Sequence, residues 1–352
     1  MSPNPFLGVL LHAIGGLAAA SFYIPYKRVK GWAWENYWIV GGVFSWLVAP
    51  IVFALIIVPS TFEVLFDAPR SAILWTWVFG VLWGVGGLTF GLSMRYLGIA
   101  LGYAIALGLC AAFGTLIPPL VSGELVETAR ETSGQIMLAG VGLCLAGIAL
   151  SGKAGMSKER ELSAAEKRAT VSEFSFIKGL AVAIVSGILS ACMAYAMQAG
   201  EPIGKVALDH GAPTLFQNLP VLIVAFFGGL LTNAVWCFIL MVRNRTLGDF
   251  AASQIDGERV PKLGNYLLCA VAGVTWYLQF FFYSMGTTQM GEYDFSSWTL
   301  HMASIIIFST LWGLALREWR GTSRRTHVWI TLGLFLLILS TVVIGYGNQL
   351  AN

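Results

Sequence analysis

The chain has 352 residues, of which 57% are hydrophobic and only 11% are charged, and its formal net charge is +3. A soluble protein would carry about 25% charged residues, so the composition excludes an ordinary soluble domain and predicts a polytopic membrane protein. A nucleic-acid-binding protein would show a basic stripe on a polar fold, and this sequence has none.

Ten apolar segments are long enough to span a bilayer, since a helix needs about 20 apolar residues to cross the hydrocarbon core. The sequence therefore predicts an all-α integral membrane fold. The first segment lacks a basic flank, so it is predicted to be a retained spanning helix and not a cleaved signal. The segments are 5–25, 37–58, 71–93, 97–121, 134–152, 176–199, 213–242, 262–285, 293–316 and 327–347.

Prolines and glycines modify these helices. Pro118 and Pro119 in the fourth segment, and Pro220 in the seventh, are expected to kink or end them locally. Pro25 is expected to end the first. The 40 glycines suit close helix packing in lipid, where small residues let backbones approach.

The basic residues alternate between the two sides of the membrane. Of the 21 Lys and Arg residues, 18 lie in the odd-numbered connections between segments. These connections are therefore predicted to be cytoplasmic, with both termini outside. The 18 are Lys27, Arg28 and Lys30; Arg95; Lys153, Lys158, Arg160, Lys167, Arg168 and Lys178; Arg243, Arg245, Arg259 and Lys262; and Arg317, Arg320, Arg324 and Arg325.

One membrane domain is predicted over 1–352, with a first half at 1–152, a cytoplasmic loop at 153–175 and a second half at 176–352. Five helices in each half force opposite orientations, which is the inverted-repeat plan of many transporters. Trp83, Phe90 and Gly98 match Trp276, Tyr283 and Gly291 at one offset. Such matches are common in apolar sequence, so two halves similar only in hydropathy stay an alternative.

Polar and aromatic residues occur together within two apolar segments in the stretch WYLQFFFYSMGTTQMGEYDFSSWTLHM, which begins at Trp276. Trp276, Gln279 and Tyr283 have the spacing of one helix face, and so do Asp294, Trp298 and His301 in the next segment. A hairpin of two such helices aims both polar faces at one cavity. An ionisable group at the bilayer centre costs about 2.5–3.5 kcal/mol, so such groups indicate function.

Asp294 and His301 are predicted to carry a coupling proton, because proton coupling needs a group whose protonation changes. The alternative for Asp294 is a cap at the start of the ninth helix. The alternative for His301 is a neutral imidazole that is hydrogen-bonded to a neighbour.

Four stretches together indicate a family more specifically than composition or helix spacing does. They are FYIPYKRVKGWAWE from Phe22, WGVGG…GLSMRYLG over 83–98, WYLQFFFY over 276–283 and EYDFSSWTLHM over 292–302. In this order they resemble the bacterial L-rhamnose–proton symporter family of the drug/metabolite transporter superfamily, over about 7–352. The resemblance implies ten helices in the bacterial inner membrane, so the termini predicted to lie outside are periplasmic. It also implies alternating-access uptake of a 6-deoxyhexose together with a proton and with no other cofactor. L-rhamnose is the first candidate for that sugar. The connections depart most, so another small sugar, or an exporter or exchanger, stays an alternative.

For such a substrate, planar hydrogen-bonding groups and aromatic faces are the expected ligands, and a 6-deoxy sugar's methyl group favours an aromatic wall. An interhelical hydrogen bond is the alternative for Gln279, and plain packing is the alternative for the aromatic residues. The predicted substrate-binding residues are Gln279, Tyr283, Trp276, Trp298, Trp83, Tyr195, Gln198 and Asn218. Tyr23, Tyr26, Lys27 and Arg95 are predicted at a cytoplasmic gate, with anchoring at the membrane surface as the alternative for Lys27 and Arg95.

Other classes fit less well. A membrane enzyme would need a catalytic cluster such as HExxH, which the sequence lacks, and no catalytic residue is predicted. The five cysteines lie in apolar runs without metal-ligand spacing, so no metal site is predicted. A nucleotide-sugar exporter would need basic residues in mid-helix to bind phosphate, and the predicted helices have none. The sequence also lacks a Walker A motif, so it gives no sign of ATP use.

Overall fold

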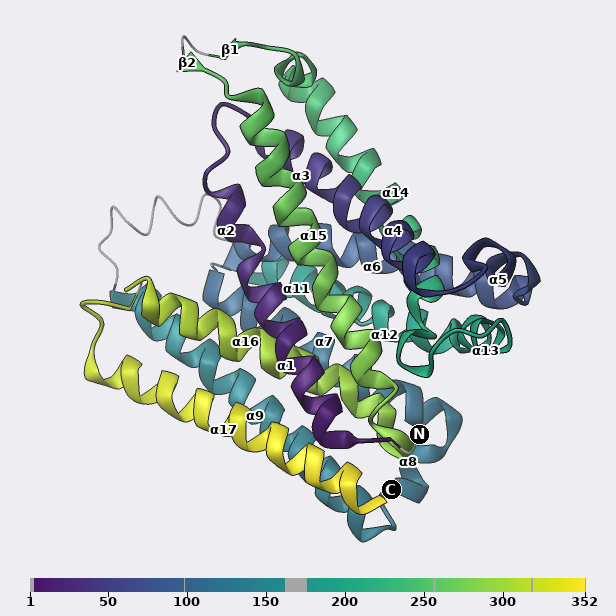
Figure 1. Cartoon of the computed structure of the whole chain (residues 1–352). Coiled ribbons are helices and arrows are strands. Elements are labelled where there is room, and N and C mark those ends of the chain that lie inside the picture. The colour runs from purple at the N-terminus through teal and green to yellow at the C-terminus, as the bar shows by residue number, and fades with distance from the viewer. Residues whose placement is uncertain (1–2, 98, 162–175, 256–257, 318, 352) are drawn as a thin grey trace. The chain divides into compact units, whose positions relative to one another are not determined.

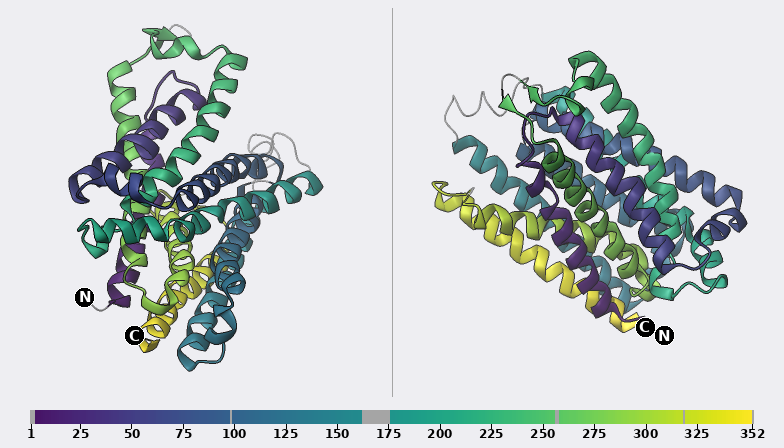
Figure 2. Two further views of the ribbon diagram at one scale, coloured as in Figure 1. Left: turned by 90° about the vertical axis from the view of Figure 1, so that its right-hand side faces the viewer. Right: turned by 45° about the horizontal axis from the view of Figure 1, so that its top comes forward.

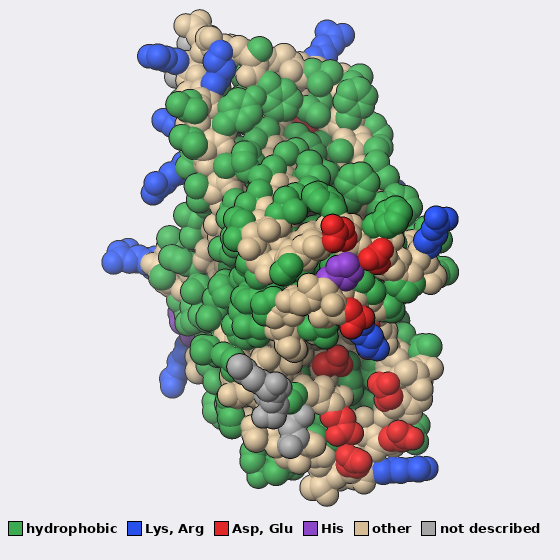
Figure 3. Space-filling view, turned by 45° about the vertical axis from the view of Figure 1, so that its right-hand side comes forward, with side chains coloured by type: hydrophobic (Ala, Val, Ile, Leu, Met, Phe, Trp, Pro, Cys, Tyr) green, Lys and Arg blue, Asp and Glu red, His purple; other side chains and the backbone are tan. Residues whose placement is uncertain are grey.

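The computed structural model describes residues 3–97, 99–161, 176–255, 258–317 and 319–351. Among these residues are ten helices long and apolar enough to cross a membrane, which confirms the predicted helical membrane fold (Figure 1). Hydrophobic side chains cover much of the visible surface (Figure 3). Ile56, Phe66 and Val121 are 78%, 89% and 82% exposed, a surface that suits lipid and not water.

The chain divides into two compact units. Unit 1 consists of Met1–Leu17, Val85–Tyr195 and Phe282–Asn352, and unit 2 of Ala18–Gly84 and Ala196–Phe281. Each predicted half of the chain therefore contributes to both units. Four helices are divided between the units: α1 (Pro5–Ser21), α6 (Arg70–Leu97), α12 (Cys192–Ala199) and α15 (Lys262–Thr287).

The divided helices hold corresponding places in the two halves. The first and third spanning helices of the first half are divided, and so are the first and third of the second half. An inverted repeat predicts this correspondence. The repeat itself stays a prediction.

Unit 1 is organised around helices that pack closely through glycines. α9 and α17 run side by side (Figures 1 and 2). A Cβ atom at Gly140 of α9 would lie 2.6 Å from Ile344 Cγ1, and one at Gly347 of α17 would lie 2.8 Å from the Met137 nitrogen. The remaining elements of unit 1 are α7 (Ile99–Ser122), α8 (Glu124–Thr128), α9 (Thr132–Glu161), α11 (Phe176–Ser190), the 3₁₀ helix η4 (Gly291–Ser296), α16 (Ser297–Ala315) and α17 (Arg324–Ala351).

Unit 2 contains one long bent helix that packs against α14. α3 (Trp34–Val43) continues through the π-helical η1 (Phe44–Val48) into α4 (Ala49–Ile57), and all three contact α14 (Leu219–Asn244). A two-stranded antiparallel hairpin lies between α14 and α15, where Gln254 pairs with Arg259. The other elements are α2 (Tyr23–Tyr26), α5 (Thr61–Asp67), α13 (Glu201–Asp209), η2 (Thr214–Phe216), η3 (Leu247–Phe250), β1 (Gln254–Ile255) and β2 (Glu258–Arg259).

The central loop begins later than predicted. α9 continues to Glu161, so Lys153, Lys158 and Arg160 are helical, and the rest of the loop, 162–175, lies outside the described residues. The ammonium of Lys153 lies 3.8 Å above the Trp329 ring, and that of Lys158 lies 4.8 Å above the Trp319 ring. These cation–π contacts stabilise the extended end of the helix.

The prolines predicted to affect the fourth and seventh segments lie close to the ends of their helices. Pro118 and Pro119 lie inside α7, which continues to Ser122. Pro220 lies in the first turn of α14. It therefore does not kink the helix interior, because the first backbone N–H groups of a helix have no partner within the helix.

We expect Gly140→Leu to destabilise unit 1, because its side chain would collide with Ile344 on α17. Overpacking of this kind costs about 1–3 kcal/mol. Gly142→Leu is the matched control, since nothing lies within 4 Å of a Cβ atom at Gly142. Thermal unfolding in detergent should show a lower midpoint for the Gly140 variant alone, and equal midpoints would contradict the packing described here.

Candidate functional site

Tyr283 lies at the centre of a buried ring cluster in unit 1. Its ring centroid lies 5.4 Å from that of His12, 5.1 Å from that of His301 and 5.6 Å from that of Trp298. The four side chains come from α1, α15 and α16, and all are buried. Three of the residues were predicted, and the structure brings them together.

Two glycines make room for these rings. A Cβ atom at Gly286, three residues after Tyr283, would lie 2.8 Å from two atoms of the His12 ring. At Gly114 of α7, a Cβ atom would overlap the Trp298 ring. The Trp298 indole also donates a hydrogen bond of 3.0 Å to the Cys110 carbonyl. The rings are therefore held in fixed slots.

His12 is the member that the sequence analysis missed. Its ring is fully buried, and neither ring nitrogen has a hydrogen-bond partner among the described residues. An ionisable residue in the middle of the first apolar segment was the signal that was available.

Asp294 is less deep than predicted. It lies in η4, ahead of the α-helix that carries Trp298 and His301, and its side chain is exposed. Tyr293 has φ −105° and ψ 44°, so the backbone there is not helical. Asp294 thus lies at the exposed start of the span Gly291–Ala315, whereas Trp298 and His301 lie in its buried part. Its role in proton coupling stays a prediction.

A second aromatic cluster lies in unit 2. The Trp276 ring lies 5.6 Å from each of Trp83, Phe226 and Trp46, and 5.4 Å from Phe280. Trp83 and Trp276, predicted from distant segments, thus contact each other. The buried Trp46 indole nitrogen has no hydrogen-bond partner among the described residues, and the sequence analysis missed it.

Gln279 lies on the same helix as Tyr283 but in the other unit, because the boundary within α15 follows Phe281. It is buried, at 5% exposure. This burial within α15 agrees with the prediction that Gln279 does not face lipid. Its role in binding stays a prediction.

The secondary candidates are scattered. Tyr195 donates a hydrogen bond of 2.9 Å to the Phe113 carbonyl in unit 1. In unit 2, Gln198 is exposed, and Asn218 lies partly buried just ahead of α14. Their part in a substrate path stays a prediction.

The predicted gate tyrosines form one aromatic group in unit 2. The Tyr23 and Tyr37 hydroxyls are 3.2 Å apart, and the Tyr26 ring lies 5.6 Å from Tyr23 and 5.1 Å from Tyr37. Lys27 follows α2 and is exposed. Arg95 belongs to α6, not to a loop as predicted, and its side chain lies outside the described part of the structure.

Glu35 is a buried carboxylate, and its partners explain it structurally. It accepts hydrogen bonds from Asn244 Nδ2 at 3.0 Å and from the Thr246 hydroxyl at 2.9 Å. It also lies in the first turn of α3, where the helix dipole stabilises negative charge. These contacts make Glu35 an anchor between α3 and the end of α14.

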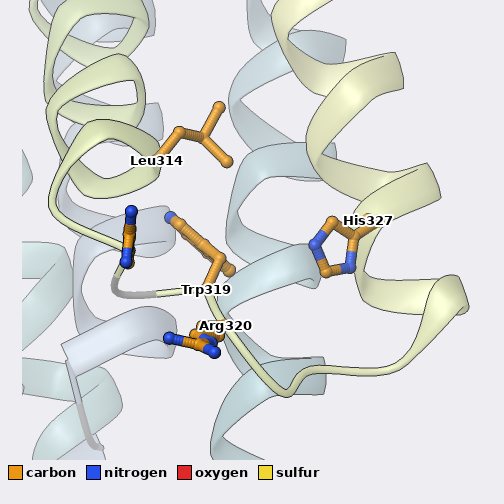
Figure 4. Close-up of a pocket in the computed structure, with 5 residues that line it drawn as sticks. Leu314, Trp319, Arg320 and His327 are labelled. Carbon is orange, nitrogen blue, oxygen red and sulfur yellow. The ribbon is translucent and has the colours of Figure 1, made fainter.

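A separate pocket of about 430 Å³ lies where α16 ends and α17 begins (Figure 4). Leu314, Arg317, Trp319, Arg320 and His327 line it. Two guanidinium groups suit an anion and not a neutral sugar, so we do not place the substrate there. Among the described residues, no group of three His, Cys, Asp or Glu side chains is arranged to hold a metal ion.

Comparison with known proteins identifies the family. The family model described as L-rhamnose-proton symport protein matches residues 1–350. L-rhamnose-proton symporters of Cronobacter sakazakii and Salmonella gallinarum are 37% and 36% identical to the chain over 348 residues, which cover 99% of this chain and 99% of each relative. The chain belongs to the L-rhamnose–proton symporter family.

Membership in this symporter family confirms the resemblance seen in the four sequence stretches. The family consists of transporters, which agrees with the prediction that the chain is not an enzyme. A solved crystal structure matches with a TM-score of 0.53 and 15% identity, covering 96% of this chain and 95% of that one. That likeness shows a shared fold alone.

We expect Glu35→Leu to lower thermal stability, because it leaves the Asn244 and Thr246 side chains without their acceptor, at a cost of about 1–3 kcal/mol. Glu35→Gln is the matched control, since its amide oxygen takes the place of the carboxylate oxygen. The thermal unfolding midpoint in detergent should fall clearly only for the Leu variant. An equal fall for both would mean that the charge itself holds the two helices together.

Proposed function

We propose that this protein is a secondary active transporter that takes up L-rhamnose together with protons across the bacterial inner membrane. The observation that carries the proposal is the match over 99% of the length of relatives that bear the name L-rhamnose-proton symporter. Ten membrane-spanning helices suit this function. A proton supplies the driving force, so no bound cofactor is required.

In this proposal, the ring cluster of unit 1 forms part of the sugar site. Tyr283 and Trp298 present aromatic faces to the C–H side and the methyl group of the sugar. Within unit 2, Gln279, Trp276 and Trp83 are proposed as substrate ligands in their own right, an amide and two further aromatic faces. His301 and Asp294 carry the coupling proton, and the exposed Asp294 exchanges it with the aqueous side.

Alternating access is proposed to follow from the two units. Each half of the chain contributes to both units, and corresponding helices are divided between them, which supports an inverted repeat. Transporters of that plan expose one central site to each side of the membrane in turn. The divided helices α1, α6, α12 and α15 are the proposed elements along which such a change is transmitted.

The proposed orientation has cytoplasmic basic connections and periplasmic termini. It rests on the 18 basic residues in odd-numbered connections, several of which extend the ends of α6 and α9. Arg317, Arg320 and Lys153 are among these 18 residues and are proposed to lie on the cytoplasmic side. Positive residues are retained on the cytoplasmic side during insertion.

Sugar uptake by the purified protein in proteoliposomes tests the substrate. We expect an imposed pH gradient, acid outside, to drive accumulation of L-rhamnose. L-mannose, which adds only a 6-hydroxyl group, should compete about 10- to 100-fold less well, because an apolar wall rejects a hydroxyl moderately. Faster gradient-driven uptake of another small sugar under the same conditions would assign that sugar in its place.

We expect Asp294→Asn to abolish uphill accumulation while leaving some sugar exchange, because the variant has no carboxylate to carry the proton. One charge moving through 100 mV supplies about 2.3 kcal/mol, which the variant would lose. Glu292→Gln, which removes an exposed charge from the same turn, is the matched control. Normal uphill uptake by Asp294→Asn in the same vesicles would remove Asp294 from the coupling role.

A further inference from the structure

His12 has two buried ring nitrogens that form no hydrogen bond with any described residue. The imidazole of this α1 residue is 0% exposed, and neither Nδ1 nor Nε2 has a hydrogen-bond partner among the described residues. A neutral imidazole has one N–H donor and one acceptor nitrogen. Leaving one such group buried without a partner costs about 1–3 kcal/mol. A stable helix that carries this cost indicates a ligand that is bound in another step.

The ring is also held in place, which suits a binding role. The His12 ring packs against Gly286, which has no side chain. A Cβ atom at Gly286 would lie 2.8 Å from two atoms of the His12 ring. The Tyr283 ring contacts it at 5.4 Å. A fixed ring aims its donor and acceptor in fixed directions, so little conformational freedom is lost when they bind.

The chemistry of the surroundings narrows the ligand class. The titratable neighbours of His12 include Tyr283, whose ring contacts it, and His301, whose ring lies 5.1 Å from that of Tyr283. No carboxylate forms an ion pair with His12 in the described residues. A neutral ligand that carries hydroxyl groups matches this site, because a hydroxyl can donate to one imidazole nitrogen or accept from the other, and the rings of Tyr283 and Trp298 can pack against its C–H side.

We propose that His12 binds the sugar directly, through a hydrogen bond between one of its ring nitrogens and one sugar hydroxyl. This inference rests on the proposed function, since it takes L-rhamnose as the ligand. It adds α1 to the helices that carry the binding site. It also distinguishes His12 from His301, to which the coupling proton is assigned.

Direct binding measurements at fixed pH test the role of His12. The wild-type protein and the His12→Leu and His12→Gln variants are compared by calorimetry with L-rhamnose in detergent, after size-exclusion chromatography confirms that each is folded. We expect at least about tenfold weaker binding for His12→Leu, the loss of a buried hydrogen bond. His12→Gln, which keeps a donor and an acceptor, should retain more affinity than His12→Leu.

The remaining outcomes are also decisive. Unchanged affinity in a folded His12→Leu variant would overturn the inference and leave the proposed function intact. Wild-type protein that does not bind L-rhamnose would overturn the proposed function and this inference with it. A folded His12→Leu variant that binds the sugar normally but loses gradient-driven uptake would make His12 a proton carrier, which also overturns the inference.

¹⁵N NMR of the histidine rings tests the role of His12 in the wild-type protein, without any substitution that could prevent folding. The chain has only four histidines, and His210 and His327 lie outside the ring cluster, so both serve as internal controls. In ¹⁵N-histidine-labelled wild-type protein, saturating L-rhamnose should shift the His12 ring signals and leave those two unchanged. Unmoved His12 signals at saturation would overturn the inference.

Discussion

A protein surrounded by lipid must satisfy its buried polar groups internally or with what it carries, because no water is present in the hydrocarbon core. Most polar side chains described here obey this constraint. Glu35 accepts two side-chain hydrogen bonds, and Trp298 donates to a backbone carbonyl. His12 does not, at either ring nitrogen. Trp46 Nε1, Thr76 Oγ1 and the Tyr277 hydroxyl also lack a partner among the described residues, so His12 is set apart by its place in the ring cluster as well as by its unmet hydrogen bonds.

Glycine determines how closely the elements around this cluster approach. Gly286 admits the His12 ring beside α15, and Gly114 admits the Trp298 ring beside α7. The same principle acts in the scaffold, where Gly140 and Gly347 bring α9 and α17 together. Close packing of small residues against rings replaces the hydrophobic driving force that lipid removes. The site and the scaffold of unit 1 therefore rely on one kind of contact.

Two carboxylates of the chain, Glu35 and Asp294, lie in different surroundings. Glu35 is buried and satisfied by Asn244 and Thr246, so its charge is part of the fold. Asp294 is exposed in the 3₁₀ helix η4, directly ahead of the helix that carries His301. In the proposed mechanism, a proton enters at an exposed carboxylate and reaches the buried imidazole of His301 beside the same tyrosine. Exposure suits exchange with water, and burial suits control by the substrate.

The sequence alone determined the ten helices and the family, because long apolar runs and a basic-residue bias report directly on lipid and membrane sidedness. It also placed Tyr283, Trp298 and His301 in one site, since helical spacing over one hairpin is local information. Only the tertiary structure decided that His12 joins them, that Trp83 contacts Trp276, and that Asp294 precedes its helix. The first two depend on contacts between segments far apart in the chain, and the third on a backbone turn at Tyr293 that helical periodicity does not encode.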